Sequence, residues 1–435
     1  MRKIAWIIAA ALGLSLAACG GGGGNSSSSS SSTANAPVAA SAPAAASSPN
    51  TSTSNVLAVD ASAVPTPVGP GNTMSVTVSG TGIHNQPMVS IKLCTAGSGA
   101  ASNCTTIPNV IVDTGSYGLR LVRSAIPNAT FSTLTAETDS ASGLPLAECA
   151  LFGSGYAWGT VYQADLALTP TEVASKLPIQ VIGDSTLTTT APSECQVGRQ
   201  LATVADLGGN GILGIGVSPT DCGSACANVA VPTYYYSSAG NATKVPVNQQ
   251  VANPVTLFAQ DNNGVILEMA QVSDTGSASA QGTLVFGIDT QANNALAGTG
   301  APLVKTDING NFTSTYYGST LTKTFFDSGS TVLFFPDQTI ARSNPSGYYV
   351  PTSTVGRTTT LTGTSPASVA LGFNIGNATT LSASGNNAFN NLGIYMSGQF
   401  DFGLPFFYGR HVYYGISGRT STGGGTGPYV AYVSS

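Results

Sequence analysis

The chain contains, at residues 110–116, the sequence Val-Ile-Val-Asp-Thr-Gly-Ser, and at residues 324–330 the similar sequence Thr-Phe-Phe-Asp-Ser-Gly-Ser. In each copy, apolar residues typical of a buried strand lead to an Asp, which is followed by a hydroxyl residue, a Gly and a second hydroxyl residue. The Gly permits a tight turn of the backbone. We therefore expect two strand-to-turn units, related by a weak duplication, that each hold one carboxylate in place.

The two carboxylates, Asp113 and Asp327, are candidate catalytic residues. Two neighbouring carboxylates cannot both ionise readily, so they share one proton; one can then activate water while the other protonates a carbonyl oxygen. The residues after each Asp offer hydroxyls and amides that can support the carboxylates: Thr114, Gly115, Ser116, Ser328, Gly329 and Ser330. The alternative is a pair of Asx-turns that close surface hairpins, but the apolar residues before each Asp favour burial.

Composition agrees with a β-rich protein. The 435 residues include 52 Gly, 24 Pro and only 8% charged residues, with 14 Asp against 5 Glu. Asp favours turns and Glu favours helices, so this balance argues against a helix-rich protein or a coiled coil. With 14 Lys+Arg against 19 Asp+Glu the chain is not a basic nucleic-acid binder, and two His argue against a His-rich metal site or a haem protein.

Apolar and polar residues alternate in several segments, which predicts half-buried strands. Met74, Val76 and Val78 alternate with hydroxyl residues, and residues 89–93 show the same pattern. Short apolar runs at 284–286 and 412–414 predict buried strands. Residues 249–258 are the best candidate for a short helix, although Pro254 limits it.

Further motifs lie between and after the two Asp units in a characteristic order. Residues 152–159 contain Phe-Gly-Ser-Gly and then Trp-Gly, residues 211–216 read Gly-Ile-Leu-Gly-Ile-Gly, residues 282–289 read Gly-Thr-Leu-Val-Phe-Gly-Ile-Asp, and residues 400–407 read Phe-Asp-Phe-Gly-Leu-Pro-Phe-Phe. Their order from residue 72 to 418 resembles that of the pepsin-like aspartic peptidases, in which such segments form the flap, the strand beside the first Asp loop, the strand between the lobes and the second apolar-Gly element. The chain also resembles an uncharacterised family of bacterial lipoproteins with the same paired turns.

This resemblance implies an all-β fold, a bilobal pepsin-like double β-barrel with a cleft between the lobes. The N-terminal lobe would span residues 58–293 and the C-terminal lobe residues 294–435. It implies catalysis by Asp113 and Asp327 with no metal and no organic cofactor. The partner would be an extended peptide or protein that lies across the cleft as an added strand.

Two positions depart from the pepsin pattern. Phe152 stands where the flap usually has a Tyr, and Arg120 stands where a Trp is usual; in the family these two positions hydrogen-bond to each other beneath the flap. Together with Gly153, and with Tyr156 as a candidate source of the missing phenol, they are the flap and substrate candidates. If Arg120 approaches the Asp pair, it favours the ionised carboxylates.

The first residues resemble a targeting signal for export. Arg2 and Lys3 precede an apolar stretch that ends in Leu-Ala-Ala-Cys at residues 16–19, which resembles the bacterial lipobox, in which the Cys becomes acylated. Residues 1–18 would be a signal peptide, and Cys19 would anchor the protein. Gly20, rather than Asp, favours the outer membrane, on its periplasmic or surface face. The alternative is an ordinary secretory signal with an incidental Cys.

Residues 19–57 are rich in Gly, Ser, Ala and Pro, and the stretch 20–55 has no charged side chain, so we expect a disordered tether. Six further cysteines remain, an even number that suggests up to three disulfides in an exported protein. The sequence does not fix their connectivity, and free buried thiols are the alternative. Cys94 and Cys104 flank a Gly- and Ser-rich loop, and Cys222 and Cys226 could close a small loop. Cys149 and Cys195 are the remaining pair.

Three weaker motifs have simpler structural explanations. Residues 209–214 match G-x-G-x-x-G without a following helix pattern, so a strand explains them better than a dinucleotide site. His411 lies in a strand pattern, and no nucleophile signature accompanies it or His84. Residues 234–236, three Tyr, are expected to pack rather than to form a ligand platform.

The sequence thus predicts an exported, membrane-tethered aspartic endopeptidase. The alternative is a catalytically weak or inactive protein of the same fold that binds a peptide, a glycan or a protein, because fold alone does not establish activity.

Overall fold

The structure is a computed structural model that describes residues 61–80, 82–365 and 367–435. The expected signal peptide, the lipidation site Cys19 and the tether 19–57 lie outside the described residues. Within the described part of the chain, no helix is both long and apolar enough to cross a membrane.

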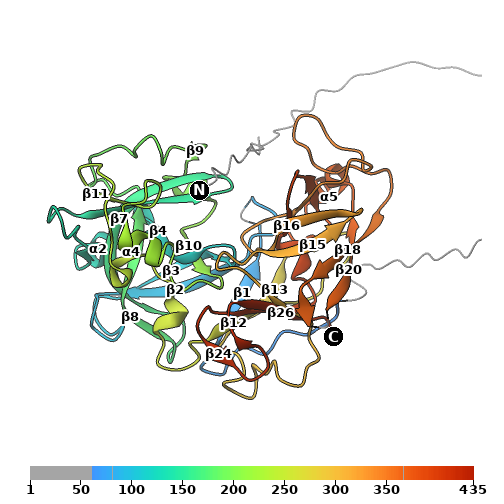
Figure 1. Ribbon diagram of the computed structural model, residues 1–435, viewed down its shortest axis with the longest axis horizontal. Coiled ribbons are helices and arrows are strands. Elements are labelled where there is room, and N and C mark those ends of the chain that lie inside the picture. Colours follow the sequence, from blue (N-terminus) through green and yellow to red (C-terminus); the bar gives the residue numbers. More distant parts are fainter. Residues whose placement is uncertain (1–60, 81, 366) are drawn as a thin grey trace, which may run out of the picture. The chain divides into compact units, whose positions relative to one another are not determined.

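The largest sheet has 17 strands. Figure 1 labels most of its strands, whose bounds are β1 (Thr73–Val78), β2 (Met88–Cys94), β3 (Thr105–Asp113), β4 (Tyr117–Val122), β5 (Thr135–Ala136), β6 (Leu146–Phe152), β7 (Gly155–Ala167), β8 (Val173–Ile182), β9 (Arg199–Gln200), β10 (Gly211–Ile215), β11 (Tyr235–Ser237), β12 (Gly264–Met269), β13 (Ala280–Phe286), β14 (Leu303–Lys305), β19 (Thr364–Ser365), β23 (Arg410–Gly415) and β26 (Tyr429–Val433).

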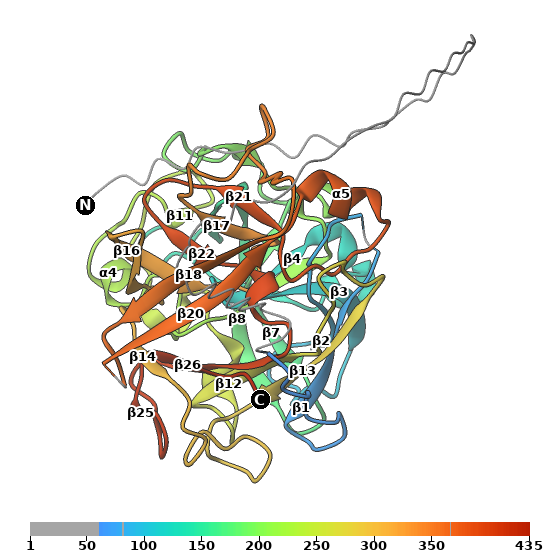
Figure 2. The ribbon, with the colours of Figure 1, turned by 90° about the vertical axis from the view of Figure 1, so that its right-hand side faces the viewer.

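A second sheet of seven strands is built from residues 312–402. Its strands are β15 (Phe312–Tyr316), β16 (Ser319–Phe326), β17 (Leu333–Phe335), β18 (Val355–Thr362), β20 (Ser368–Ile375), β21 (Gly393–Tyr395) and β22 (Phe400–Phe402). Figure 2 shows the long antiparallel pair β18 and β20 side by side. A small ribbon joins β24 (Thr420–Ser421) to β25 (Gly425–Thr426).

Helices are short in the described residues. The α-helices are α2 (Asn128–Phe131), α3 (Val204–Leu207), α4 (Ser224–Asn228) and α5 (Ala378–Ala383), and the 3₁₀ turns are η1 (Arg123–Ala125), η2 (Val247–Gln249), η3 (Pro254–Leu257) and η4 (Leu404–Phe406). The all-β class expected from composition is therefore confirmed.

The alternating segments form strands as expected. In β1, Met74, Val76 and Val78 are buried, whereas Ser75 is exposed. Residues 89, 91 and 93 of β2 are likewise buried. Side chains alternate between the two faces of a strand, so one face of each of these strands packs into the core.

The helix expected at residues 249–258 is wrong. The segment forms the two separate 3₁₀ turns η2 and η3, with extended backbone between them. Pro254 has no backbone N–H to donate and begins η3, and the side chain of Asn253 accepts a hydrogen bond from Val255 N. The chain therefore starts a new turn at Pro254 instead of continuing a helix.

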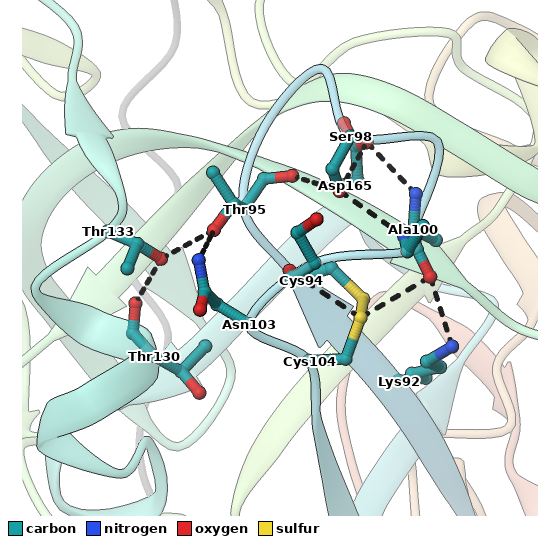
Figure 3. The surroundings of a disulfide bond; sticks show 12 residues. Lys92, Cys94, Thr95, Ser98, Ala100, Asn103, Cys104, Thr130, Thr133 and Asp165 are labelled. Atoms are coloured by element: carbon teal, nitrogen blue, oxygen red, sulfur yellow. Dashed lines mark hydrogen bonds between the residues drawn. A yellow bond between two sulfur atoms is a disulfide. The ribbon is translucent and has the colours of Figure 1, made fainter.

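Three disulfides join Cys94 to Cys104, Cys149 to Cys195 and Cys222 to Cys226. These are the pairs that the sequence made most plausible. Figure 3 shows the first of them, which closes a Gly- and Ser-rich loop. The buried carboxylate of Asp165 holds that loop, because it accepts hydrogen bonds from Gly97 N at 2.8 Å and Ala100 N at 3.1 Å.

The expected division into lobes at residue 293 stays a prediction. The second sheet lies wholly after that residue, but β14, β23 and β26, which also follow it, belong to the large sheet. Strand β12 pairs with β13 on one side and with β23 on the other. Strand β23 thus returns to pair with a strand from before residue 293, and β26 joins the large sheet through β23.

The duplicated units have the same strand arrangement, and this positions the site. In the first, β3 pairs in parallel with β10, and β10 pairs antiparallel with β4. In the second, β16 pairs in parallel with β22, and β22 pairs antiparallel with β17. In both units, therefore, the strand that ends at the Asp turn is held by the later apolar-Gly strand, which also pairs with the strand that leaves the turn.

Candidate functional site

The two Asp turns meet face to face. A Cβ atom added to Gly115 would lie 2.6 Å from the carboxyl carbon of Asp327, and one added to Gly329 would lie 2.7 Å from Asp113 Oδ1. Each carboxylate therefore packs against the Gly of the opposite turn, where no side chain fits. Both Gly residues are needed for this close approach.

Each carboxylate is held by its own turn. Asp113 accepts hydrogen bonds from Gly115 N at 2.8 Å and from the Ser116 hydroxyl at 2.6 Å. Asp327 accepts from Gly329 N at 2.8 Å, and its Oδ2 lies 2.9 Å from the Ser330 hydroxyl. The last hydroxyl residue and the Gly of each turn thus support the carboxylates as the sequence predicts, and they fix the two side-chain rotamers.

The middle hydroxyl residues have a different role from the one expected. Thr114 N donates to Ser328 Oγ at 3.1 Å, and Ser328 N donates to Thr114 Oγ1 at 2.9 Å. The Ser328 hydroxyl donates in turn to Val112 O at 2.7 Å. Thr114 and Ser328 therefore tie the two turns to each other rather than to the carboxylates, and this exchange holds the Asp pair together.

The electrostatics of the pair favour one shared proton. Burial first, and then the charge of Asp113, raise the pKa of Asp327 to about 8. A buried carboxyl beside another carboxylate keeps its proton well above the pH at which an exposed Asp loses it. At neutral pH the pair therefore carries one proton, which is the state that acid–base chemistry on a peptide carbonyl requires.

A third carboxyl lies next to the pair, and the sequence analysis did not single it out. Asp401, in β22, is 4% exposed, and its Oδ2 lies 2.6 Å from the Ser330 hydroxyl. Comparison of the two apolar-Gly segments within the sequence could have revealed it, because the first segment has Ile212 at the position where the second has Asp401. Burial first, and then the charges of Asp327 and Asp113, raise the pKa of Asp401 well above its usual range.

The expected flap is present as a hairpin. Strands β6 and β7 pair in antiparallel fashion up to the pair of Phe152 and Gly155, so Gly153 lies in the turn. The Phe152 ring packs on the buried cluster of Met88, Ile111 and Ile212, which includes residues of the two strands beneath the first Asp turn. The hairpin thus lies against the same strands that carry Asp113.

Tyr156 lies elsewhere and does not replace the missing phenol beside Phe152. It is 8% exposed and packs with Cys149, Cys195, Trp158 and Tyr236, around the disulfide that joins β6 to a later loop.

Arg120 does not join the Asp pair. Its guanidinium donates to Glu148 Oε1 at 2.5 Å and lies 3.4 Å from Asp221 Oδ2. The same guanidinium lies 5.8 Å from the centre of the Phe152 ring. The two positions that depart from the pepsin pattern therefore still contact each other, but through a cation–π contact. Arg120 belongs to a buried ionic network beneath the flap.

That network includes two residues that the sequence analysis missed. Glu148, in flap strand β6, is fully buried, and Asp221 accepts a hydrogen bond from Tyr235 OH at 2.7 Å. Burial first, and then the neighbouring Glu148 carboxylate, raise the pKa of Asp221 well above its usual range. One guanidinium thus faces two carboxyls, and the protonated form of Asp221 reduces their repulsion.

The weaker motifs have structural roles. Residues 211–215 form strand β10, as expected. His411 Nδ1 lies 3.3 Å from Glu268 Oε1, away from the Asp pair. Tyr235 and Tyr236 are buried in packing clusters. Among the described residues no group of three or more His, Cys, Asp or Glu side chains is arranged to hold a metal ion.

Residues 69–432 match the family described as "Protein of unknown function (DUF3443)". No curated protein matches the sequence. Among solved structures, the chain is similar to the crystal structure of aspartic proteinase from Irpex lacteus, with 16% sequence identity and a TM-score of 0.49 over 83% of this chain and 97% of that chain. Independently of that likeness, the paired Asp turns, each held by a parallel apolar-Gly strand, confirm the pepsin-like fold expected from the sequence.

Proposed function

We propose that this chain, which belongs to the DUF3443 family, is an exported, membrane-tethered aspartic endopeptidase. The observation that supports this most is the geometry of Asp113 and Asp327. Each carboxylate fills the space above the Gly of the opposite turn, and the charge of Asp113 contributes to the raised pKa of Asp327. Two buried carboxylates that face each other repel, and this repulsion lowers the stability of the fold. A purely structural role therefore does not account for the arrangement.

The chemistry follows from one proton shared by two carboxyls. In the proposed reaction one carboxyl takes a proton from a water molecule, which attacks the peptide carbonyl carbon, while the other carboxyl donates its proton to the carbonyl oxygen. The amide and hydroxyl donors on each Asp keep both carboxylates oriented through the cycle. The flap hairpin would cover an extended peptide and supply backbone hydrogen bonds to it.

The test is hydrolysis of a varied peptide library by the purified mature protein, with a statine-type transition-state analogue as inhibitor. Since the pair needs its shared proton and the pKa of Asp327 is about 8, we expect activity to persist to neutral pH and to fall as the pH rises through about 8. Absence of inhibitor-sensitive cleavage from acid to neutral pH would contradict the proposal.

A binding protein without peptidase activity is the second candidate. The observation that favours it is at the flap, where Phe152 has no hydroxyl and the Arg120 guanidinium is engaged by Glu148 and Asp221. Such a protein would bind an extended peptide, a glycan or another protein between flap and Asp turns. Equal ligand binding by the wild type and by an Asp-to-Asn variant, without cleavage, would support this candidate.

We further propose that Cys19 carries the lipid anchor and that the outer membrane of a bacterium holds the protein. The lipobox-like residues 16–19 support this proposal. Cys19→Ser is expected to move the protein from the membrane fraction to the soluble fraction, or to leave an uncleaved precursor. The measurement is fractionation of cell envelopes with metabolic labelling by a fatty acid. Wild type found wholly in the soluble periplasmic fraction would rule out the anchor.

A further inference from the structure

Asp401 occupies a position at which the first unit has an apolar residue. In the second unit, Asp401 of β22 pairs with Phe325 of β16, and in the first unit Ile212 of β10 pairs with Ile111 of β3. Asp401 is 4% exposed and Ile212 is 5% exposed, so both side chains are buried. The two units thus differ by a buried carboxyl beside the second Asp turn.

One hydroxyl lies between Asp401 and the Asp pair. Ser330 Oγ is 2.9 Å from Asp327 Oδ2 and 2.6 Å from Asp401 Oδ2. A serine hydroxyl has one proton and can donate it to only one of these oxygens. At the other contact Ser330 accepts, so that carboxyl must carry a proton.

The surroundings of Asp327 and Asp401 show which of the two carboxyls carries this proton. Asp327 Oδ1 accepts a hydrogen bond from Gly329 N at 2.8 Å, so this oxygen has a donor. Asp401 Oδ1, by contrast, is buried and has no hydrogen-bond partner among the described residues. An ionised Asp401 would leave a charged oxygen buried without a donor, which is costly, whereas a protonated Asp401 leaves only a neutral carbonyl oxygen there.

The charges around Asp401 act in the same direction. On the strands that pair with β22, Phe325 of β16 and Phe334 of β17 lie opposite Asp401, and neither carries a charge. The titratable groups that interact with Asp401 are Asp327, Asp113 and the buried phenol of Tyr414 in β23. Two carboxylates and a neutral phenol do not stabilise a third negative charge.

We propose that Asp401 is a positioning residue that stays protonated, donates to Ser330 Oγ and so directs the single Ser330 proton onto Asp327 Oδ2. Three neighbouring carboxyls then hold two protons: one on Asp401, and one shared by Asp113 and Asp327. The importance of this arrangement for hydrolysis rests on the proposed function, but the protonation of Asp401 does not.

The first test measures protonation and needs no substrate. Infrared difference spectra of the full mature protein at about pH 6 should contain the carbonyl band of a protonated carboxylic acid that disappears in Asp401→Asn, because an exposed Asp is ionised at that pH. Ser330→Ala should shift this band, since Asp401 loses its partner. The matched control is Ser116→Ala, which removes the equivalent hydroxyl of the first turn and should leave the band unchanged.

The unfolding free energy gives a second readout. A carboxyl whose folded-state pKa is raised contributes stability at low pH, and this contribution is lost as the pH rises through that pKa. Asp401→Asn removes the group, so the stability of the variant relative to the wild type should increase as the pH rises above about 4. If no carboxylic acid band is lost and the relative stability does not rise with pH, Asp401 is ionised and the inference is overturned.

The third readout concerns catalysis. The Asn side chain keeps a donor toward Ser330, so Asp401→Asn should retain kcat within about tenfold of the wild type, and the alkaline limb of its pH profile should reflect one proton loss instead of two. A loss of activity as complete as that of an Asp327 variant would overturn the positioning role. An inactive wild type with an intact Asp401 band would instead refute the peptidase proposal and leave the protonation of Asp401 standing.

Discussion

Asp327→Asn is expected to lower peptide hydrolysis by at least about 10³-fold, and Asp113→Asn by a similar factor, because either change removes the carboxyl pair that shares a proton. The double variant is expected to be no worse than either single variant, since the two residues act as one unit. Folding should survive, because the Asn oxygen can still accept from the turn amides at 2.8 Å. The measurement is kcat/KM for one identified peptide, together with circular dichroism.

A matched control is Asp307→Asn, in an exposed turn where the carboxylate also accepts backbone hydrogen bonds, from Asn309 N and Asn311 N at 2.8 Å. This variant should hydrolyse peptides as the wild type does. Single Asp113 or Asp327 variants that keep substantial activity would show that the pair is not the catalytic unit. If the Asn variants lose activity because they are unfolded, the Ser116→Ala and Ser330→Ala variants provide the test instead. They keep both carboxyls and should lower kcat with less effect on KM.

Arg120→Met is expected to lower the free energy of unfolding by about 3–5 kcal/mol at neutral pH. The Met side chain has a similar length but no charge, so the fully buried Glu148 loses its partner at 2.5 Å. Asp221 loses the cation with which it forms an ion pair. Urea denaturation at neutral pH measures this loss.

The control for this prediction is Arg199→Met, since Arg199 is exposed in β9 and an exposed substitution usually changes stability by less than about 0.5 kcal/mol. Adding Glu148→Gln and Asp221→Asn to Arg120→Met should restore part of the lost stability, because no buried charge is then left unpaired. An Arg120→Met variant as stable as the Arg199 variant would show that the network does not hold the flap strand in place.

The fold class could be predicted from the sequence because its signals are local. The alternation in residues 74–78 reports one buried strand face, and it requires no knowledge of the strand's partner. The Asp turns were equally visible, since a strand followed by Asp, hydroxyl, Gly and hydroxyl is a local pattern. The one wrong element is also local: a helix was expected at residues 249–258, but Pro254 and the Asn253 cap divide the segment.

The order of the motifs, through the resemblance that it carries, also indicated that Asp113 and Asp327 belong to one site. The sequence predicted the role of only two of the four hydroxyl residues in the Asp turns. Ser116 and Ser330 support their own carboxylates three residues earlier, a contact that the turn alone dictates. Thr114 and Ser328, 214 residues apart, exchange hydrogen bonds across the two turns, and that contact exists only once the turns have met.

Sequence alone therefore determined the strands, the two Asp turns and the even set of cysteines, because backbone sterics and side-chain periodicity act within a few residues. Tertiary structure alone decided that Arg120 pairs with Glu148 and Asp221 instead of approaching the catalytic candidates, and that Asp401 shares the Ser330 hydroxyl with Asp327 from 71 residues away. These contacts depend on the register of strands that are distant in the chain. Buried polar groups must find partners wherever that register places them, and no local pattern records which partners those will be.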